Sequence, residues 1–483
     1  MTEQSCLRNE RIKLMTVRSS HPSTFDVAVI GAGVVGCAVF REFVLAGART
    51  VILERDADVL NGASKGNSGL LHTGFDAQPD TLEAKCVRDG YRAYCDIHER
   101  LNLPLRKTGA IVIAWTEDEV AKLPAIMAQA RANGVDVRSL SAAEVCREAP
   151  AINEKAKAGV LVPGESVIDP WSAPLAYLLQ GLANGGVVLR NAEVGGGRLA
   201  DGMWSLDVAG GGVIKASVVI NCAGNYGDLV EAIARQSPFH IRPRKGQFVV
   251  FDKTAFGLAP RILLPVPSAR TKGVVVGQSA FGNLIVGPTA EDQDERRIAT
   301  VEEATLAALI AEGSRIVPAL AQHSVTAVYA GLRPATQFKD YQIEALSKER
   351  WITVGGIRST GLTGSLGIAR HIRELYEDRF GALAGRDSIE WTPAPNLAED
   401  RPRAYQKKGR SAIVCHCELV TESEIEAAFE DPLPVATLGG LRRRTRCMMG
   451  RCQGFYCTRR ISELAAGRIR ELPEPTANQR NNG

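Results

Sequence analysis

Five cysteines stand close together near the C-terminus, whereas the first 414 residues contain only six. They are Cys415, Cys417, Cys447, Cys452 and Cys457, in the segments CHCELVTESEIEAAF and RCMMGRCQGFYC. Such a group is either cross-linked by disulfides or holds a metal. Cys415-x-Cys417, then 34 intervening residues, then Cys452-x4-Cys457 supply four thiolates, the number that a [2Fe–2S] cluster requires. Zinc held by four cysteines also fits that number, although the spacing differs from the common Cys-x2-Cys pairs.

A glycine-rich turn near the N-terminus predicts a second kind of chemistry. The segment FDVAVIGAGVVGCAVFREFVLAGARTVILERD reads as strand, turn, helix and strand. Gly31 permits the tight turn, Gly33 lets a pyrophosphate approach the backbone, and Gly36 lets the helix pack closely on the sheet. Glu54 follows Gly36 by 18 residues, where a carboxylate can bind ribose hydroxyls. The pattern predicts dinucleotide binding and leaves NAD and FAD open.

Composition limits the remaining possibilities. The chain is 45% hydrophobic and 23% charged with a net charge of +4, which is typical of a globular protein of more than one domain. No lysine-rich run interleaved with aromatics is present, so we expect no nucleic-acid partner. No long apolar stretch or signal-peptide core appears, so we expect no transmembrane segment and a cytoplasmic location. Cytosolic thiols stay reduced, which favours metal ligation by the clustered cysteines.

Six further segments carry a family resemblance. In order they are NGASKGNSGLLHTGFDAQPDTLEAK (61–85), INCAGNYGD (220–228), PRKGQF (243–248), GNLIVGPTAED (282–292), AGLRPAT (330–336) and GGIRSTGLTGSLGIA (355–369). Over about residues 25–395 this series resembles the FAD-dependent glycerol-3-phosphate dehydrogenase and oxidase family of the D-amino-acid-oxidase-like flavoproteins. It is also similar to L-2-hydroxyglutarate oxidases. The resemblance implies FAD rather than NAD.

The resemblance implies a set of FAD contacts, position by position. Small residues in such loops leave backbone N–H groups accessible to polar cofactor edges. The glycine turn and Glu54 would hold the ADP half, later loops would line the pyrophosphate, adenine and flavin, and the start of a helix would face the oxygen side of the flavin ring. The implied residues are Gly31, Gly33, Gly36, Glu54, Ser64, Asn67, Gly69, Val194, Ala223, Gly224, Gly361, Leu362, Thr363 and Gly364.

Three residues are candidates for substrate chemistry. His72, in GLLHTGFD, matches the histidine motif of the oxidase branch, and a histidine can remove the hydroxyl proton while hydride leaves for flavin N5. Arg333 is the predicted anion clamp, because guanidinium makes two parallel hydrogen bonds to phosphate or carboxylate. Arg358 is predicted to bind substrate but departs from the residue expected there in the oxidase branch. Lys272 and Lys339 would add positive charge, or be ordinary solvated lysines.

The cysteine-rich tail resembles the bacterioferritin-associated-ferredoxin-like domain of the large subunit of anaerobic glycerol-3-phosphate dehydrogenase. This resemblance implies a [2Fe–2S] cluster held by Cys415, Cys417, Cys452 and Cys457, with Cys447 as a spare thiol. A basic run precedes the cluster motif and suits a group with about two net negative charges; the alternative is a solvated face. The run consists of Arg442, Arg443, Arg444 and Arg446.

These residues require particular elements to position them. We expect an α/β and α+β chain in which a Rossmann-like FAD-binding domain and a mixed-sheet substrate domain are interleaved over residues 25–395. Residues 1–24 are predicted to be a disordered lead, 396–410 a linker, 411–467 a small helical [2Fe–2S] domain and 468–483 a flexible tail. The cysteines Cys37 and Cys222 are expected to be small buried residues.

Together the motifs predict an FAD-dependent enzyme that oxidises glycerol 3-phosphate or a related polyol phosphate. A cluster accepts one electron at a time, which implies export to a partner protein or a quinone-linked chain rather than to NAD. The alternatives are an L-2-hydroxyglutarate-type or other 2-hydroxy acid dehydrogenase, the flavin subunit of an amino-acid or opine dehydrogenase complex, and a non-catalytic electron-transfer module. Any contact with the inner membrane would be peripheral, through partners.

Overall fold

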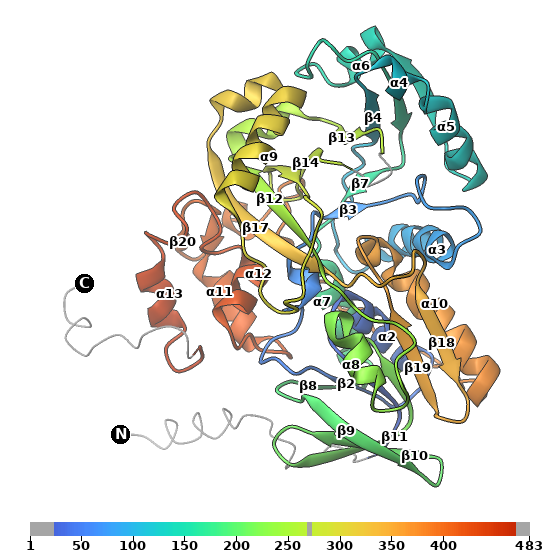
Figure 1. Cartoon of the computed structure of the whole chain (residues 1–483). Helices are drawn as coiled ribbons and strands as arrows, with labels where there is room; N and C mark the ends of the chain where they lie inside the picture. Colours follow the sequence, from blue (N-terminus) through green and yellow to red (C-terminus); the bar gives the residue numbers. More distant parts are fainter. Residues whose placement is uncertain (1–23, 268–272, 470–483) are drawn as a thin grey trace, which may run out of the picture.

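The structure is a computed structural model that describes residues 24–267 and 273–469. Residues 1–23 and 470–483, nearly all of the predicted lead and tail, lie outside the described residues, as does Lys272. Two large sheets lie one above the other in the view of Figure 1, with the C-terminal segment beside them. The predicted α/β and α+β fold is confirmed, with strands and helices of both sheets drawn from interleaved parts of the chain.

The first sheet contains the predicted βαβ unit. Its central strands are parallel, and β18 pairs antiparallel with β19 at one edge while β9 and β10 extend from β11. The path order is β18 (Gln342–Leu346), β19 (Trp351–Gly355), β11 (Gly212–Asn221), β1 (Thr24–Ile30), β2 (Thr50–Leu53) and β8 (Val187–Leu189), with β9 (Val194–Ala200) and β10 (Met203–Val208) off this path.

Both faces of this sheet are buried, which explains the nearly continuous apolar run of β1. Val27 and Val29 lie in a core shared with the helices α2 (Val34–Leu45), α7 (Ser172–Ala183) and α10 (Gly361–Phe380). Ala28 and Ile30 lie in a second core shared with β9 and β10. The predicted buried cysteines Cys37 and Cys222 are confirmed as members of the first core.

Helix α10 approaches α3 (Leu82–Ile97) closely because glycines stand at their crossing. A Cβ on Gly90 would lie 2.1 Å from the Thr363 carbonyl oxygen, and one on Gly367 would lie 2.1 Å from the Cys86 carbonyl oxygen. No side chain fits at either position without moving backbone. The two glycines therefore fix where the N-terminus of α10 stands.

The second sheet forms the other half of the interleaved body. All its neighbouring strands are antiparallel except β13 and β4, and α9 (Glu303–Ile316) and α5 (Leu123–Ala132) contribute to its cores. The path order is β16 (Glu291–Asp292), β12 (Arg244–Phe251), β15 (Leu284–Gly287), β14 (Val275–Gln278), β13 (Ile262–Pro265), β4 (Ala110–Ala114), β6 (Ala158–Val162) and β5 (Arg138–Ser141), with β17 (Val325–Arg333) paired to β12.

The C-terminal segment folds around its own small core. The strands β20 (Ile413–Cys415) and β21 (Val420–Thr421) pair, and α11 (Glu422–Glu430), α12 (Leu438–Thr445) and α13 (Thr458–Leu464) follow. Thr421 begins α11 with a reciprocal capping box that includes Glu424. This is the small, mainly helical unit that was predicted.

The carboxylate of Asp58, in the loop after β2, holds α12 in place. The Asp58 Oδ2 atom accepts hydrogen bonds from the Ala436 and Thr437 backbone N–H groups at 3.0 and 2.8 Å and from the Thr437 hydroxyl at 2.8 Å. Its Oδ1 atom lies 3.3 Å from Arg190 Nη1, which also donates to the Pro434 carbonyl oxygen. Asp58 is buried. A negative charge at a helix N-terminus is favourable, so this contact fastens the C-terminal unit to the rest of the chain.

The basic run 442–446 is not a solvated face. Arg443 and Arg446 are buried, and Arg443 Nη2 donates to the Val59 carbonyl oxygen at 3.1 Å. Arg446 Nη2 lies 3.1 Å from Glu418 Oε2, and its guanidinium lies 4.0 Å from the Phe281 ring centroid. The residues predicted as a linker are also attached, since buried Arg403 donates to the Glu418 carbonyl oxygen. The run serves as an internal interface.

Removal of the Asp58 carboxylate should loosen the C-terminal unit. In Asp58→Ala, two backbone N–H groups and a hydroxyl lose their acceptor, so we expect the free energy of unfolding to fall by about 1–3 kcal/mol. Trypsin should then cleave faster within 396–410, where Lys407 and Lys408 are exposed. Chemical denaturation and timed proteolysis measure both effects. Asp136→Ala, at an exposed aspartate before β5, is the matched control; equal proteolysis of both variants would contradict the role of Asp58.

Candidate active site and cofactor sites

The glycine turn after β1 lets other groups approach its backbone closely. Gly31 has a φ of +99°, which favours glycine, and a Cβ on Gly36 would lie 1.8 Å from the Gly31 carbonyl oxygen. Helix α2 begins directly afterwards, and its Val34 N–H donates to the Ser64 hydroxyl at 2.9 Å. The helix N-terminus therefore faces the same space as the predicted Ser64, which suits an anionic group.

Glu54 closes one side of this space at the end of β2. Its Oε2 atom accepts the Ala32 N–H and its Oε1 atom accepts the Asp56 N–H, both at 2.9 Å. Burial raises the pKa of Glu54, and the two backbone hydrogen bonds oppose that rise. The carboxylate is therefore held in one orientation beside the turn, where hydroxyl groups of a ligand can donate to it.

A cavity of about 570 Å³ brings most of the predicted cofactor residues together. Its lining includes the following predicted residues: Gly31, Gly33, Glu54, Ser64, Asn67, Val194, Ala223, Gly224, Gly361 and Leu362. Four predicted cofactor residues do not line the cavity and lie behind its wall: Gly36, Gly69, Thr363 and Gly364. For example, the Thr363 hydroxyl accepts the His72 backbone N–H at 3.0 Å, and Gly69 N–H donates to Asn67 Oδ1 at 2.7 Å.

The cavity also contains basic residues that sequence reasoning missed. Arg55, Lys65, Arg296 and Arg297 line it. The Arg55 guanidinium lies 3.8 Å from the Tyr226 ring centroid, and Arg296 bonds both oxygens of Asp228. Of these four residues, only Arg296 and Arg297 could have been found from the sequence, because they lie in the charged segment 294–297 shortly after the motif at 282–292. Arg296 and Arg297 pair with Asp228 and Asp56, whereas Arg55, Lys65 and the helix N-terminus suit a ligand with a diphosphate, so the residues present fit FAD.

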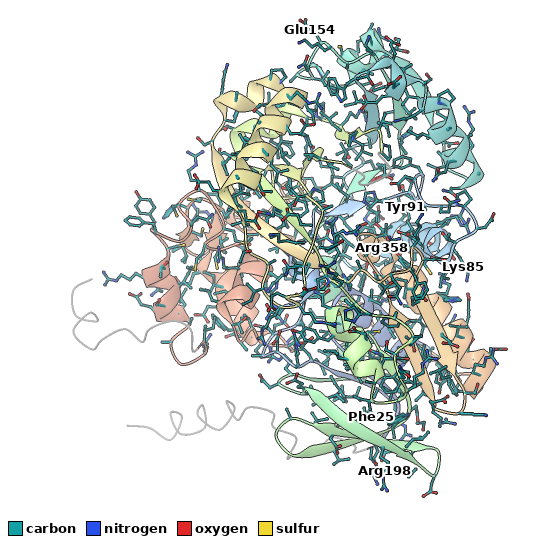
Figure 2. All side chains as sticks on the ribbon, in the orientation of Figure 1. Phe25, Lys85, Tyr91, Glu154, Arg198 and Arg358 are labelled. Carbon is teal, nitrogen blue, oxygen red and sulfur yellow. The ribbon has the colours of Figure 1, made fainter. Side chains whose placement is uncertain are left out.

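A second cavity, of about 670 Å³, adjoins the first. Ser68, Pro288, Arg333, Arg358 and Ser359 line both, so the two spaces meet at these residues. Figure 2 places Arg358 near the middle of the molecule, between the two sheets. His72 and Lys339 line the second cavity only. The three predicted substrate residues therefore share one cavity that opens onto the cofactor space.

His72 is oriented by a buried carboxylate that the sequence did not reveal. Its Nδ1 atom lies 2.9 Å from Glu165 Oε2, and Glu165 is fully buried. The other carboxylate oxygen accepts the Thr73 N–H at 2.6 Å and the Thr73 hydroxyl at 2.8 Å. Short strands β3 (Leu70–Leu71) and β7 (Ser166–Val167) pair and bring these distant residues together. With Nδ1 bonded to a carboxylate, Nε2 is the ring atom that can accept a proton.

Arg333 ends β17 and is held by backbone carbonyls. Its Nη2 atom donates to the Thr289 and Lys245 carbonyl oxygens at 2.7 and 3.2 Å, and its Nε atom donates to the Arg244 carbonyl oxygen at 3.2 Å. Burial lowers the pKa of Arg333 to about 10, so it stays cationic at neutral pH. A fixed and poorly solvated guanidinium is a strong site for an anion.

Arg358 is arranged differently from Arg333. Its Nη2 atom donates to the Lys339 carbonyl oxygen and lies 3.4 Å from Glu83 Oε2. Glu83 also accepts the Thr360 hydroxyl at 2.7 Å, at the residue before α10. The charge of Arg358 is thus partly balanced by Glu83, whereas the hydrogen bonds of Arg333 go to neutral carbonyls and the nearby Asp292 is paired with Arg244. Arg333 is the better anion site of the two.

The four predicted cluster cysteines come together as two pairs. The Cys415 and Cys457 thiols hydrogen-bond to each other and are buried, and Cys417 and Cys452 form the second, more accessible pair. The hydrogen bond from Cys457 is the main effect that lowers the pKa of Cys415. Within residues 24–267 and 273–469, no three His, Cys, Asp or Glu side chains converge closely enough to hold one metal ion. Two pairs suit two irons better than one zinc.

Backbone N–H groups surround these sulfur atoms. Met448 and Glu418 direct theirs at Cys415, and Gly454 and Tyr456 direct theirs at Cys452. Such donors stabilise thiolates and cluster sulfides, so the residues present fit a [2Fe–2S] cluster. Burial raises the pKa of the fifth thiol, Cys447, to about 12. That environment agrees with the predicted role of Cys447 as a spare thiol.

A dinucleotide cavity that opens onto a histidine and arginine cavity defines an oxidoreductase of the flavoprotein class. Comparisons agree: residues 26–375 match the family described as FAD dependent oxidoreductase (DAO), and residues 413–466 match the BFD-like [2Fe-2S] binding domain. The chain belongs to the FAD-dependent oxidoreductase family, and its cofactors are FAD and a [2Fe–2S] cluster. The predicted family, enzyme class and cofactors are confirmed.

Individual relatives are consistent with this assignment. The chain is 30% identical over 451 residues to a glycerol 3-phosphate dehydrogenase of Caloramator mitchellensis, covering 92% of this chain and 94% of that one. It is 26% identical to one of the subunits of the anaerobic glycerol-3-phosphate dehydrogenase of Escherichia coli K12, covering 93% and 89%. The FAD-bound L-alpha-glycerophosphate oxidase of Mycoplasma pneumoniae superposes with a TM-score of 0.71 at 26% identity, covering 76% of this chain and 98% of that one.

Gly36→Ala should abolish flavin binding, because the added methyl group would displace the Gly31 carbonyl and open the turn. The variant should purify with little flavin absorbance per mole of protein. Gly257→Ala is a suitable control, since a Cβ there meets nothing within 4 Å. Full flavin occupancy in Gly36→Ala would show that the cofactor does not rest on this turn.

Substitution of single cysteines should distinguish the four predicted cluster ligands from the spare thiol Cys447. Cys452→Ser should lose most of the iron, whereas Cys447→Ser should retain about two irons per chain, the content of one [2Fe–2S] cluster. Iron and sulfide analysis with the visible spectrum of anaerobically purified protein measures this. Iron loss in Cys447→Ser together with retention in Cys452→Ser would reverse the assignment.

Proposed function

We propose that this protein oxidises the secondary alcohol of glycerol 3-phosphate and exports the electrons one at a time to a partner protein or a quinone-linked chain. One observation carries the proposal: Arg333 and His72 line the same cavity, that cavity opens onto the cofactor space, and buried Glu165 bonds the His72 ring. An anion clamp and a proton acceptor at the flavin are the two groups that this oxidation needs.

The protein's own residues supply binding, orientation and proton removal. Arg333 would hold the phosphate group, aided by the cation of Lys339, and would leave the hydroxyl-bearing carbon near the junction of the cavities. His72 Nε2 would take the hydroxyl proton, while Glu165 keeps Nδ1 as a donor and balances the resulting positive charge. Bound FAD would supply the acceptor for the hydride.

The position of the iron–sulfur unit supports electron export. Trp171 Nε1 donates to the carbonyl oxygen of Lys65, a cavity residue, at 3.2 Å. Its indole stacks on Phe281 with centroids 5.3 Å apart, and Arg446 covers Phe281 from the cluster side. Packed side chains thus lead from the cofactor cavity to the cluster segment. The Escherichia coli relative is named as one subunit of a larger enzyme, which also favours partner proteins.

We propose that contact with the inner membrane is peripheral and made through partners. Among the described residues, none of the helices has the length and apolar character needed to span a bilayer. The cytoplasmic location and the peripheral contact with the inner membrane remain predictions.

The substrate can be tested on anaerobically purified protein. We expect glycerol 3-phosphate to bleach the flavin and to produce the reduced-cluster signal in electron paramagnetic resonance spectra. Arg333→Lys should raise KM for glycerol 3-phosphate by about tenfold or more, since a hydrogen bond to a charged group contributes about 1.5–3 kcal/mol. Bleaching by L-2-hydroxyglutarate alone would assign Arg333 to a carboxylate instead. A bleached flavin beside an oxidised cluster would contradict electron export.

Loss of the Glu165 carboxylate should impair proton removal without weakening binding. In Glu165→Gln the histidine ring is free to adopt the other tautomer, so we expect kcat to fall by about tenfold or more with KM nearly unchanged. His72→Asn should lower kcat by about 100-fold or more. Steady-state kinetics measure both. Glu154→Gln, an exposed glutamate at the far end of the molecule in Figure 2, is the control. Unchanged kcat in His72→Asn would remove the histidine from the reaction.

A further inference from the structure

Two aromatic side chains project into solvent beside the cluster site. Phe455 and Tyr456 lie between the cysteines Cys452 and Cys457 and are 82% and 77% exposed. They are the most exposed of the large hydrophobic residues in the described part of the chain. Their rings meet edge to face, with centroids 5.2 Å apart. Exposed apolar groups of this size commonly mark a binding surface.

The loop that carries these rings is fixed, so their exposure is part of the fold. The Gln453 side-chain amide donates to the Thr326 carbonyl oxygen at 3.1 Å and to the Gly450 carbonyl oxygen at 2.9 Å. The Thr458 hydroxyl donates to the Gly454 carbonyl oxygen at 2.6 Å, and a Cβ on Gly454 would lie 2.8 Å from Met448. The loop cannot readily fold its aromatic rings inward.

The same loop contacts the more accessible cysteine pair. Backbone N–H groups of Gly454 and Tyr456 point at the Cys452 sulfur, and Cys452 pairs with Cys417. Cys415 and Cys457 are buried, whereas Cys417 and Cys452 are partly exposed. The aromatic rings are therefore carried by the loop whose backbone contacts the more accessible cysteine pair.

The rim of this surface is basic. No carboxylate occurs between Arg446 and Arg460 in the sequence. Arg451 is 67% exposed whereas its partner Asp252 is 9% exposed, and Arg459 is 68% exposed whereas its partner Glu463 is 33% exposed. Arg460 is likewise more exposed than Glu422. The cations face solvent and their carboxylate partners lie deeper, so a partner would meet positive charge around an apolar centre.

We propose that Phe455, Tyr456, Arg451, Arg459 and Arg460 form the docking surface for the protein that accepts the electrons. The proposal rests on the proposed function and deepens it by giving the partner's chemistry: a redox protein whose cofactor edge is ringed by acidic side chains around an apolar patch. In each encounter the reduced cluster loses one electron and the partner's oxidised cofactor gains it, with no bond made or broken. Such contacts are small, transient and salt-dependent.

Two haem proteins of opposite charge provide the probes. The soluble domain of cytochrome b5 has an acidic ring around its haem edge, and cytochrome c has a basic one. The holoprotein is reduced anaerobically, once by glycerol 3-phosphate and once by dithionite, and mixed with each cytochrome in a stopped-flow instrument. Calorimetry with oxidised cytochrome b5 measures binding independently of turnover. Ferricyanide is the small acceptor that needs no docking surface.

We expect cytochrome b5 to be reduced faster than cytochrome c at low salt, with a rate that falls as salt is added. In Phe455→Ser/Tyr456→Ser the rate constant with cytochrome b5 should fall by about tenfold or more, as for central aromatic residues of an interface. Arg459→Gln/Arg460→Gln should lose most of the salt dependence. Rates with ferricyanide should stay unchanged in Phe455→Ser/Tyr456→Ser, which keeps every charge, and calorimetry should show weaker binding of cytochrome b5 in both variants.

The control is Val213→Ser, an exposed apolar residue of β11, and Figure 1 shows the β11 strand well away from α13. Each variant is used after its spectrum shows intact flavin and cluster. Equal rates with cytochrome b5 for Phe455→Ser/Tyr456→Ser and Val213→Ser, or faster transfer to cytochrome c, would overturn the docking surface. Failure of glycerol 3-phosphate to reduce the cluster would instead overturn the proposed function, and the dithionite arm would still test docking.

Discussion

The Asp58 carboxylate is the contact on which the arrangement of the two cofactor sites depends. It belongs to the loop that follows Glu54, beside the dinucleotide cavity, yet it accepts the backbone N–H groups before α12. Helix α12 then leads to Arg446 and to Cys447, next to the cluster cysteines. Since α12 is a helix of eight residues, this buried hydrogen-bonded contact sets the distance between the two sites together with the interface contacts of Arg443 and Arg446.

Local signals in the sequence predicted much of this protein. The turn at Gly31 and Gly36 and the carboxylate of Glu54 lie within one βαβ unit, so their spacing alone indicates how they meet. The spacing of the four cysteines is equally local within two short segments. The predicted residues that do not line the cavity, such as Gly36 and Gly364, support it from behind, because close packing of helix on strand is needed before any surface can be shaped.

Other parts depend on long-range pairing that no local pattern encodes. Glu165 lies 93 residues from His72, and only the pairing of β3 with β7 brings them together. Asp58 looks like an ordinary surface aspartate in the sequence until the residues before α12, more than 370 positions later, are placed beside it. The basic run at 442–446 predicts positive charge beside the cluster, or a solvated face, and its role as an internal interface is hidden for the same reason, since an acceptor such as Val59 belongs to a distant segment.

The segment 165–171 connects His72, in the predicted substrate cavity, with the interface of the iron–sulfur unit. Glu165 orients His72, the next two residues form β7, and Trp171 then stacks on Phe281 beneath Arg446. Asp169, fully buried between these points, accepts the Trp171 and Ser172 N–H groups at 2.8 and 3.0 Å and so fixes the turn into α7. The continuous segment 165–171 therefore contacts both His72 and the interface with the cluster unit.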